Sequence, residues 1–177
     1  MTERGVFDLL AAKDPFPQQA AKLMLFGQFV GSWGIDGTWH KPDGTSRTGR
    51  GEWHFDWILG GRGIQDVLFA AGAPHHEFGS TIRCYDKNLD AWHLTWMQPS
   101  SGEFVNLLGR KLGDRIVCET FDSSPHRRWS FADITPSSFH WLGEVTSDDG
   151  KTWFLEQEMR GSRRSPAHPS RMSTDSG

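Results

Sequence analysis

The chain has 177 residues, with 19 Lys and Arg against 22 Asp and Glu and a formal net charge of −3. This length suits one domain, and the balanced charge provides no basic field to hold a nucleic-acid backbone, so we expect no nucleic-acid partner. No apolar run approaches the ~18 residues of a membrane helix. The apolar stretch 5–12 is broken by Asp8, so we expect no signal peptide, no membrane partner and a cytoplasmic protein.

The N-terminal segment 1–31 carries the signals of one helix. Asp14 and Pro15 suit a helix N-cap and the first helical position. Residues 18–30 then place Leu23, Phe26 and Val30 at helical spacing. We therefore expect one amphipathic helix ahead of the main fold.

From Trp33 onward the helical period gives way to short alternating stretches separated by turn-forming segments. Nine such segments predict about ten strands, and their short connections favour antiparallel neighbours. A closed barrel is the simplest arrangement because it leaves no free edge. We predict an all-β fold, an antiparallel up-and-down barrel over residues 32–161, followed by a disordered tail over 162–177. The turn segments are 42–44, 60–61, 72–76, 86–88, 100–102, 113–114, 124–125, 135–137 and 148–150.

Nine Trp and 12 Phe stand against a single Tyr, and period-2 alternation places the large aromatic residues on one face of each strand. In the last strand this face carries Trp153, Leu155, Gln157 and Met159, although a bulge would reverse the assignment beyond it. We expect the tryptophans to point inward and to line a ligand cavity, with plain packing as the alternative. The predicted cavity tryptophans are Trp53, Trp57, Trp92, Trp96, Trp129 and Trp141.

Residues 29–33, where a helix runs into a Gly-x-Trp, resemble the opening motif of the calycin superfamily, the lipocalin-like barrels. Residues 51–62, Tyr85 and Asp86 before a Trp-rich strand, and residues 129–136 extend the likeness to a bacterial lipocalin-like family of unknown function over about 25–161. The resemblance implies that Trp33 closes one barrel end beneath an Arg of the last strand, and Arg160 is the matching position. No second or third lipocalin motif is present, so the resemblance implies no particular ligand.

Four polar residues fall on the predicted inner face: Asp66, Asn106, Asp133 and Gln157. Polar groups in an aromatic cavity are costly unless they are paired, hydrated or used. Water and hydroxyls such as that of Thr120 would satisfy them in one interpretation. In the other, Asn106 and Gln157 orient a ligand, while Asp66 and Asp133, on nearly opposite walls, act in acid–base chemistry.

Two functions follow, and binding of a small, largely apolar or aromatic molecule is favoured narrowly. The alternative is a cofactor-independent isomerase, cyclase or lyase that moves a proton with Asp66 or Asp133.

The sequence carries no phosphate-binding loop or nucleophile elbow, so we expect no cofactor. His75, His76 and Glu77 lack a third ligand at zinc-like spacing, so we expect no metal. Cys84 and Cys118 suit the core. A homodimer is left open.

Overall fold

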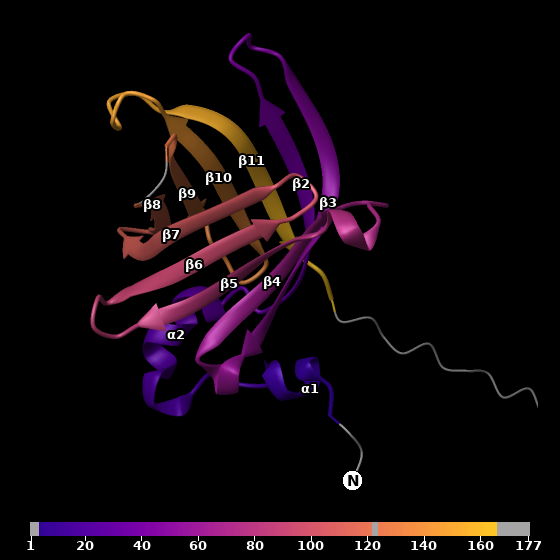
Figure 1. Ribbon diagram of the computed structural model, residues 1–177, viewed down its shortest axis with the longest axis vertical. Coiled ribbons are helices and arrows are strands. Elements are labelled where there is room, and N and C mark those ends of the chain that lie inside the picture. Colours follow the sequence, from indigo (N-terminus) through magenta and orange to yellow (C-terminus); the bar gives the residue numbers. More distant parts are fainter. Residues whose placement is uncertain (1–3, 122–123, 166–177) are drawn as a thin grey trace, which may run out of the picture.

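A closed barrel of antiparallel strands forms the body of the protein. The computed structural model describes residues 4–121 and 124–165. Within those residues, ten strands follow one another in chain order, each antiparallel to the next, and the last pairs with the first (Figure 1). The predicted up-and-down barrel is therefore confirmed. The barrel strands are β2 (Gly31–His40), β3 (Ser46–Ile58), β4 (Gly63–Ala70), β5 (Gly79–Asp86), β6 (Ala91–Gln98), β7 (Glu103–Leu112), β8 (Arg115–Thr120), β9 (His126–Ala132), β10 (Ser138–Thr146) and β11 (Phe154–Arg163).

Short elements precede the barrel: α1 (Val6–Leu10), β1 (Ala11–Ala12), η1 (Pro17–Gln19) and α2 (Ala20–Gly27). β1 pairs with the end of β3. The helix predicted here exists as α2, but the predicted start at Asp14 and Pro15 is wrong. Phe16 stands before a second proline, Pro17, and a residue before proline avoids the helical region. Its φ of −59° and ψ of 119° are not helical, so the helical segment that leads into α2 begins only at Pro17. Two further 3₁₀ turns, η2 (Leu59–Gly61) and η3 (His75–Glu77), connect strands.

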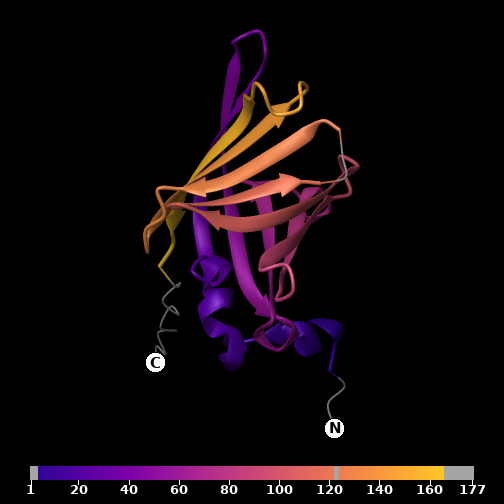
Figure 2. The same cartoon turned by 90° about the vertical axis from the view of Figure 1, so that its left-hand side faces the viewer.

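The N-terminal helices lie at one end of the barrel, and the hairpin between β2 and β3 projects from the other end (Figures 1 and 2). Leu23 and Phe26 of α2, with Phe29 just beyond it, are almost completely buried. The Phe26 ring centroid lies 5.0 Å from that of Trp92 and 6.1 Å from that of Phe131. These residues plug the lower end of the barrel with an apolar core, and we call this end the plugged end.

The predicted inward faces are confirmed along most strands. In β3, Trp53, Phe55 and Trp57 are buried, whereas His54 between them is partly exposed. The same alternation holds in β6, where Trp92, Leu94 and Trp96 are buried.

The prediction is wrong for the start of β11, because a bulge reverses the alternation there. The register with β10 shifts between Gly143 and Glu144, which leaves Glu156 as the extra residue of β11. Trp153 and Leu155 therefore fall on the outer face. The guanidinium of Arg128 stacks over the Trp153 ring there at 4.0 Å.

The barrel end that contains the plug is closed by Trp33, as the resemblance implies, but its partner is Arg163 rather than Arg160. The β2–β11 register places Arg163 opposite Trp33 and Arg160 opposite Asp36. The Arg163 guanidinium lies 4.2 Å from the Trp33 ring centroid, and Trp33 Nε1 donates to the Phe29 carbonyl at 2.7 Å. Arg160 is exposed.

β11 continues to Arg163, past the predicted barrel boundary at residue 161, so the first residues of the predicted tail belong to the barrel. Arg163 donates to the carbonyls of Gln28, Val30 and Pro136 at 2.7–2.8 Å, and these bonds hold the end of β11 against the loop after α2 and the loop between β9 and β10. Residues 166–177 of the predicted tail lie outside the described residues. Across the described chain, every helix is too short or too polar to cross a membrane.

Candidate functional site: an aromatic cavity

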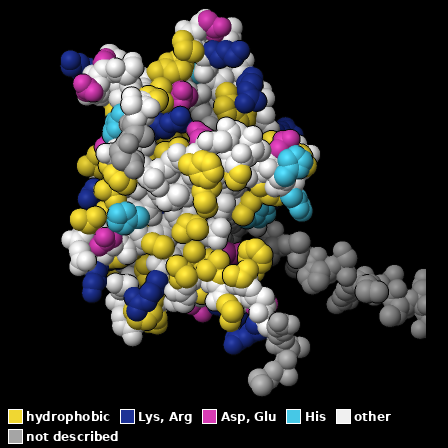
Figure 3. Space-filling model, in the orientation of Figure 1, with side chains coloured by type: hydrophobic (Ala, Val, Ile, Leu, Met, Phe, Trp, Pro, Cys, Tyr) yellow, Lys and Arg dark blue, Asp and Glu magenta, His cyan; other side chains and the backbone are white. Residues whose placement is uncertain are grey.

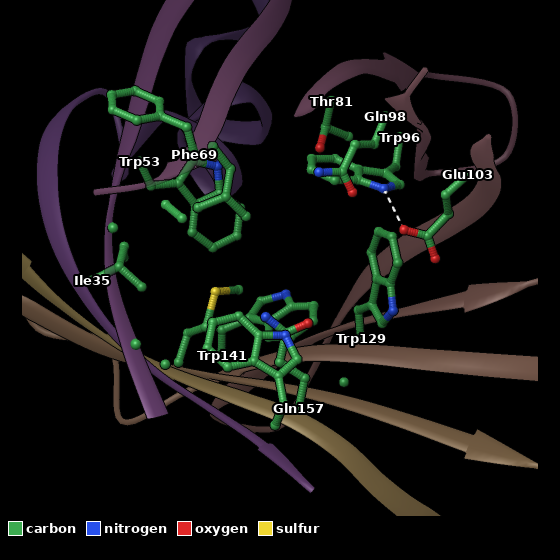
Figure 4. Close-up of a pocket in the computed structure, with 18 of the residues that line it drawn as sticks. Ile35, Trp53, Phe69, Thr81, Trp96, Gln98, Glu103, Trp129, Trp141 and Gln157 are labelled. Carbon is green, nitrogen blue, oxygen red and sulfur yellow. Dashed lines mark hydrogen bonds between the residues drawn. The ribbon is translucent and has the colours of Figure 1, made fainter. Parts of the chain in front are cut away.

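A cavity of about 370 Å³ lies inside the barrel, between the plugged end and the strand ends on the other side. That volume corresponds to roughly a dozen waters of the bulk liquid and falls within the usual range of small-molecule sites. Indole rings dominate its wall, as Figure 4 shows for four of the tryptophans. The tryptophans that line it are Trp39, Trp53, Trp96, Trp129 and Trp141.

The lumen stays open because some of these rings lie directly against glycines of the barrel wall. A Cβ added at Gly143 would come within 2.6 Å of the Trp141 ring, and one added at Gly79 would overlap the ring of Trp96. Close approach of this kind requires residues without a side chain. The bulky indoles therefore cover the wall instead of crossing the cavity.

Four of the six predicted cavity tryptophans line the cavity, but Trp57 and Trp92 do not. Both are buried at the plugged end. A Cβ on Gly27 of α2 would lie 2.5 Å from the Trp57 ring, and Trp92 packs edge-on against Phe26. The prediction was wrong for these two because the strand pattern shows which side chains point inward, not how far α2 reaches into the barrel.

Of the two predicted ligand-orienting amides, Gln157 lines the cavity and Asn106 does not. Gln157 points into it from β11, as Figure 4 shows. Asn106 is on the outer face of β7, where its Oδ1 accepts a hydrogen bond from Thr95 Oγ1 at 3.0 Å. Val105 and Leu107 take the inward positions. The inward prediction for Asn106 was wrong because its neighbours on both faces are apolar, so the alternation was ambiguous.

Asp66 points inward as predicted, but its carboxylate is fully engaged in a buried ion pair. Oδ2 accepts a hydrogen bond from Arg83 Nη1, and Oδ1 accepts the Thr81 backbone N–H at 2.9 Å. Both side chains of the pair are almost completely buried. The guanidinium of Arg83 also lies 5.3 Å from the Phe55 ring centroid and 5.4 Å from that of Phe26. Arg83 and Thr81 line the cavity, so the surface offered to a ligand here is the arginine.

Asp133 lies outside the barrel, contrary to the prediction. It follows the last residue of β9 in a turn with a φ of +50°. Its side chain is 78% exposed, and Oδ2 is 3.9 Å from His140 Nδ1. The strand alternation was extended one residue beyond the point where the strand ends, which explains the error.

Two residues that line the cavity, Trp53 and Arg83, each have one buried nitrogen, Nε1 and Nε respectively, with no hydrogen-bond partner within residues 4–121 and 124–165. Both groups lie against Phe55. Its ring centroid is 4.9 Å from the Trp53 ring and 5.3 Å from the Arg83 guanidinium. Most buried polar groups in proteins have a partner, so these two nitrogens are exceptions within the apolar core around Phe55.

The mouth of the cavity is charged, a feature that the sequence analysis missed. Glu103 accepts hydrogen bonds from Trp96 Nε1 at 3.0 Å, drawn in Figure 4, and from Arg127 Nη1 at 2.9 Å. On the other side, the Arg47 guanidinium stacks on Trp39 at 4.2 Å. Trp39 could have been found from the alternation that starts at Trp33. Nothing in the sequence indicated the pairing of Glu103 with Arg127, because these residues belong to β7 and β9 and are 24 residues apart in the chain.

Cys118 also lines the cavity, and burial raises the pKa of its thiol to about 12. Burial likewise raises the pKa of Cys84, which is half-buried. Both cysteines are free thiols, but only Cys118 is a buried core residue as predicted, whereas Cys84 is partly exposed. In the part of the chain that the structure describes, no group of His, Cys, Asp and Glu side chains is arranged to hold a metal ion.

The closed ten-stranded antiparallel barrel, plugged at one end by a short N-terminal helical region and hollow above it, has a lipocalin-like fold. Solved structures share it. An S-type phycobiliprotein lyase, CPES, from Guillardia theta matches 81% of this chain and 92% of its own with a TM-score of 0.57 and 13% sequence identity. Rv2717c from M. tuberculosis matches 86% of this chain and 100% of its own with a TM-score of 0.56 and 15% identity.

At these identities the likeness shows the fold alone. No protein-family model matches the sequence, and no curated protein shows significant sequence similarity to it.

Proposed function

We propose that this protein binds a small, largely apolar or aromatic molecule in the barrel cavity. The observation that carries the proposal is the open lumen of about 370 Å³ with indole rings along its wall. An indole wall favours flat or apolar ligands through burial and aromatic contact. The glycines beneath Trp96 and Trp141 support the same conclusion, because they keep the rings out of the lumen.

The fold comparison is consistent with this proposal, since one of the similar structures is named as a phycobiliprotein lyase. The acid–base alternative depended on Asp66 and Asp133. Asp66 is held by Arg83 and Thr81, and Asp133 lies outside the barrel. Neither carboxylate offers a free oxygen to the cavity, so we propose binding rather than catalysis by these residues.

The test is a titration with N-phenyl-1-naphthylamine, a neutral aromatic dye whose emission rises in an apolar site. Leu68→Trp places an indole in the lumen, because Leu68 lines the cavity. Val67→Trp, its neighbour in β4, places the same side chain on the outer face, where Val67 pairs with His54. We expect wild type to bind the dye with a Kd well below 1 mM, which corresponds to about −4 kcal/mol. Leu68→Trp should weaken binding at least about tenfold, and Val67→Trp less than about twofold.

Two results would contradict the proposal. One is no dye binding below about 1 mM, which would mean that the side chains close the lumen in solution. The other is equal binding by the two tryptophan variants, which would place the dye on the surface. Circular dichroism of both variants checks that each keeps the barrel.

A further inference from the structure

We propose that the outer face of the barrel carries a second site, in which Ser32 attacks a small ester and His54 acts as its general base. The site is separate from the cavity. Ser32 lies on β2 and faces His54 across the pairing with β3. Their neighbours Trp33 and Phe55 are buried on the inner face, whereas Ser32 and His54 are partly exposed and within reach of a dissolved substrate.

Three side chains form a hydrogen-bonded chain on the outer face of these two strands. Ser32 Oγ is 2.9 Å from His54 Nδ1, and His54 Nε2 is 2.9 Å from Glu52 Oε2. Because a carboxylate only accepts hydrogen bonds, the neutral imidazole carries its proton on Nε2 and leaves Nδ1 to accept the hydroxyl proton. A serine, a base and an acid linked in this order have the roles of a catalytic triad, which is recognised by geometry and not by a sequence motif.

The base and its acid are both held in place. Arg164 Nη1 lies 2.7 Å from Glu52 Oε1, and the hydrogen bonds from His54 and Arg164 lower the pKa of the Glu52 carboxyl. The ring of Phe69 stacks on the imidazole with a centroid distance of 5.7 Å and an interplanar angle of 11°. The carboxylate therefore stays ionised and positions the imidazole for proton transfer.

Arg164 also brings a positive charge beside Ser32. Its backbone N–H donates to the Ser32 carbonyl at 2.8 Å, so the two residues are neighbours where β2 lies next to the end of β11 (Figure 1). A Cβ added at Gly34, the next outward position of β2, would lie 3.4 Å from Arg164 Nε. The guanidinium therefore lies over the outer face of β2, where it can stabilise the negative charge that develops on an ester carbonyl oxygen during attack.

The surface beside the triad favours a substrate with a flat apolar or aromatic group. Phe69 stacks on Phe78 with a centroid distance of 4.1 Å, and the Phe78 ring contacts that of His75 at 4.9 Å. Phe69 and Phe78 are only partly buried. An aromatic or apolar group placed against these rings would gain burial and aromatic contact, so the substrate class is a small ester of this kind.

The reaction is acyl transfer to serine followed by hydrolysis. Ser32 Oγ forms a bond to the acyl carbon while its proton passes to His54 Nδ1. The C–O bond of the ester then breaks, and the leaving alcohol takes that proton. Water attacks the acyl-serine by the same route, which releases the carboxylic acid and restores the hydroxyl. Water is the only co-reactant.

The experiment uses two probes, 1-naphthyl acetate and an alkyl fluorophosphonate. Hydrolysis of the ester is followed by the emission of 1-naphthol. The fluorophosphonate bonds to an activated serine with loss of fluoride, and the labelled residue is identified by mass spectrometry. Ser32→Ala removes the nucleophile, and His54→Gln removes the base.

Two variants on the same outer face are matched controls. Ser80→Ala removes a partly buried serine whose hydroxyl is bonded to Gln65 and to a main-chain carbonyl. His93→Gln removes a histidine that faces Asp86 at 3.3 Å. Both controls should hydrolyse the ester as wild type does, and circular dichroism checks that every variant keeps the barrel.

We expect the fluorophosphonate to label Ser32 in wild type. Ester hydrolysis should fall at least about 100-fold in Ser32→Ala and in His54→Gln, the usual effect of losing general-base assistance. Glu52→Gln should lower kcat and leave KM unchanged, because Glu52 acts on the reaction only through His54.

The proposal is wrong if the fluorophosphonate leaves Ser32 unlabelled, or if Ser32→Ala hydrolyses the ester at the wild-type rate. Either result would mean that the hydrogen-bonded chain only holds β2, β3 and the end of β11 together. Labelling of wild type requires no variant, so it decides the question even if His54→Gln does not fold. None of these results bears on the cavity, which the dye titration tests separately.

Discussion

Replacing Asp66 by Asn should destabilise the protein strongly, because it leaves the buried guanidinium of Arg83 without its counter-charge. Both side chains of this pair are at most 3% exposed. Breaking a buried ion pair by removing one partner costs about 3–5 kcal/mol, against a total stability of about 5–15 kcal/mol for a typical domain. For a chain of this size, each kcal/mol lowers Tm by about 2–4 °C. We therefore expect Asp66→Asn to lower Tm by roughly 6–20 °C.

Urea unfolding followed by circular dichroism measures the loss of free energy directly. Asp36→Asn is the matched control. Asp36 also lies on a barrel strand and pairs with Arg50 at 3.5 Å, but those side chains are 76% and 86% exposed. An exposed pair of this kind contributes about 0–1 kcal/mol, so the control should unfold almost like wild type.

The double variant Asp66→Asn with Arg83→Met separates an ion pair from two independent packing effects. Removing both charges also removes the unpaired cation, so the double variant should be more stable than the sum of the single losses predicts, by more than about 1 kcal/mol. Additive losses would refute the argument. So would an Asp66→Asn variant within about 1 kcal/mol of wild type, since this would mean that water reaches the guanidinium.

Arg163→Met should lower the free energy of unfolding in urea by about 3 kcal/mol, because it removes hydrogen bonds to main-chain carbonyls and the stacking on Trp33. Arg160→Met should change it little. Equal losses in the two variants would contradict closure of the barrel by Arg163. The pKa of Asp148 is lowered to about 2, chiefly by hydrogen bonds from Thr152. A lowered pKa stabilises the fold above the ordinary value near 3.8, and this contribution is lost as the pH falls through about 2. The Tm difference between wild type and Asp148→Asn should therefore be full above pH 4 and shrink toward pH 2, and a constant difference would refute it.

Much of the barrel could be predicted from the sequence because its causes are local. Period-2 alternation in residues such as Trp53, Phe55 and Trp57 is a property of a single strand, and turn chemistry is a property of a few consecutive residues. The number of strands, their antiparallel order and the inward direction of most tryptophans follow from these local rules. They also place Asp66 and Gln157 correctly on the inner face.

The errors occurred where a local rule stops applying. The bulge of β11 reverses the faces of Trp153 and Leu155, and the end of β9 turns Asp133 to the outside. Both are single-residue events, and one residue is enough to move a side chain to the other face of a sheet.

Which of the inward residues line the cavity was decided by tertiary structure. How far α2 enters the barrel determines that Trp57 and Trp92 belong to the plug while Trp141 faces the lumen. The register between the first and last strands selects Arg163 to close the barrel. The pairing of β4 with β5 brings Arg83 to Asp66, which converts a candidate base into half of an ion pair. These relations join residues far apart in the chain, so they depend on packing and strand register, which no short stretch of sequence encodes.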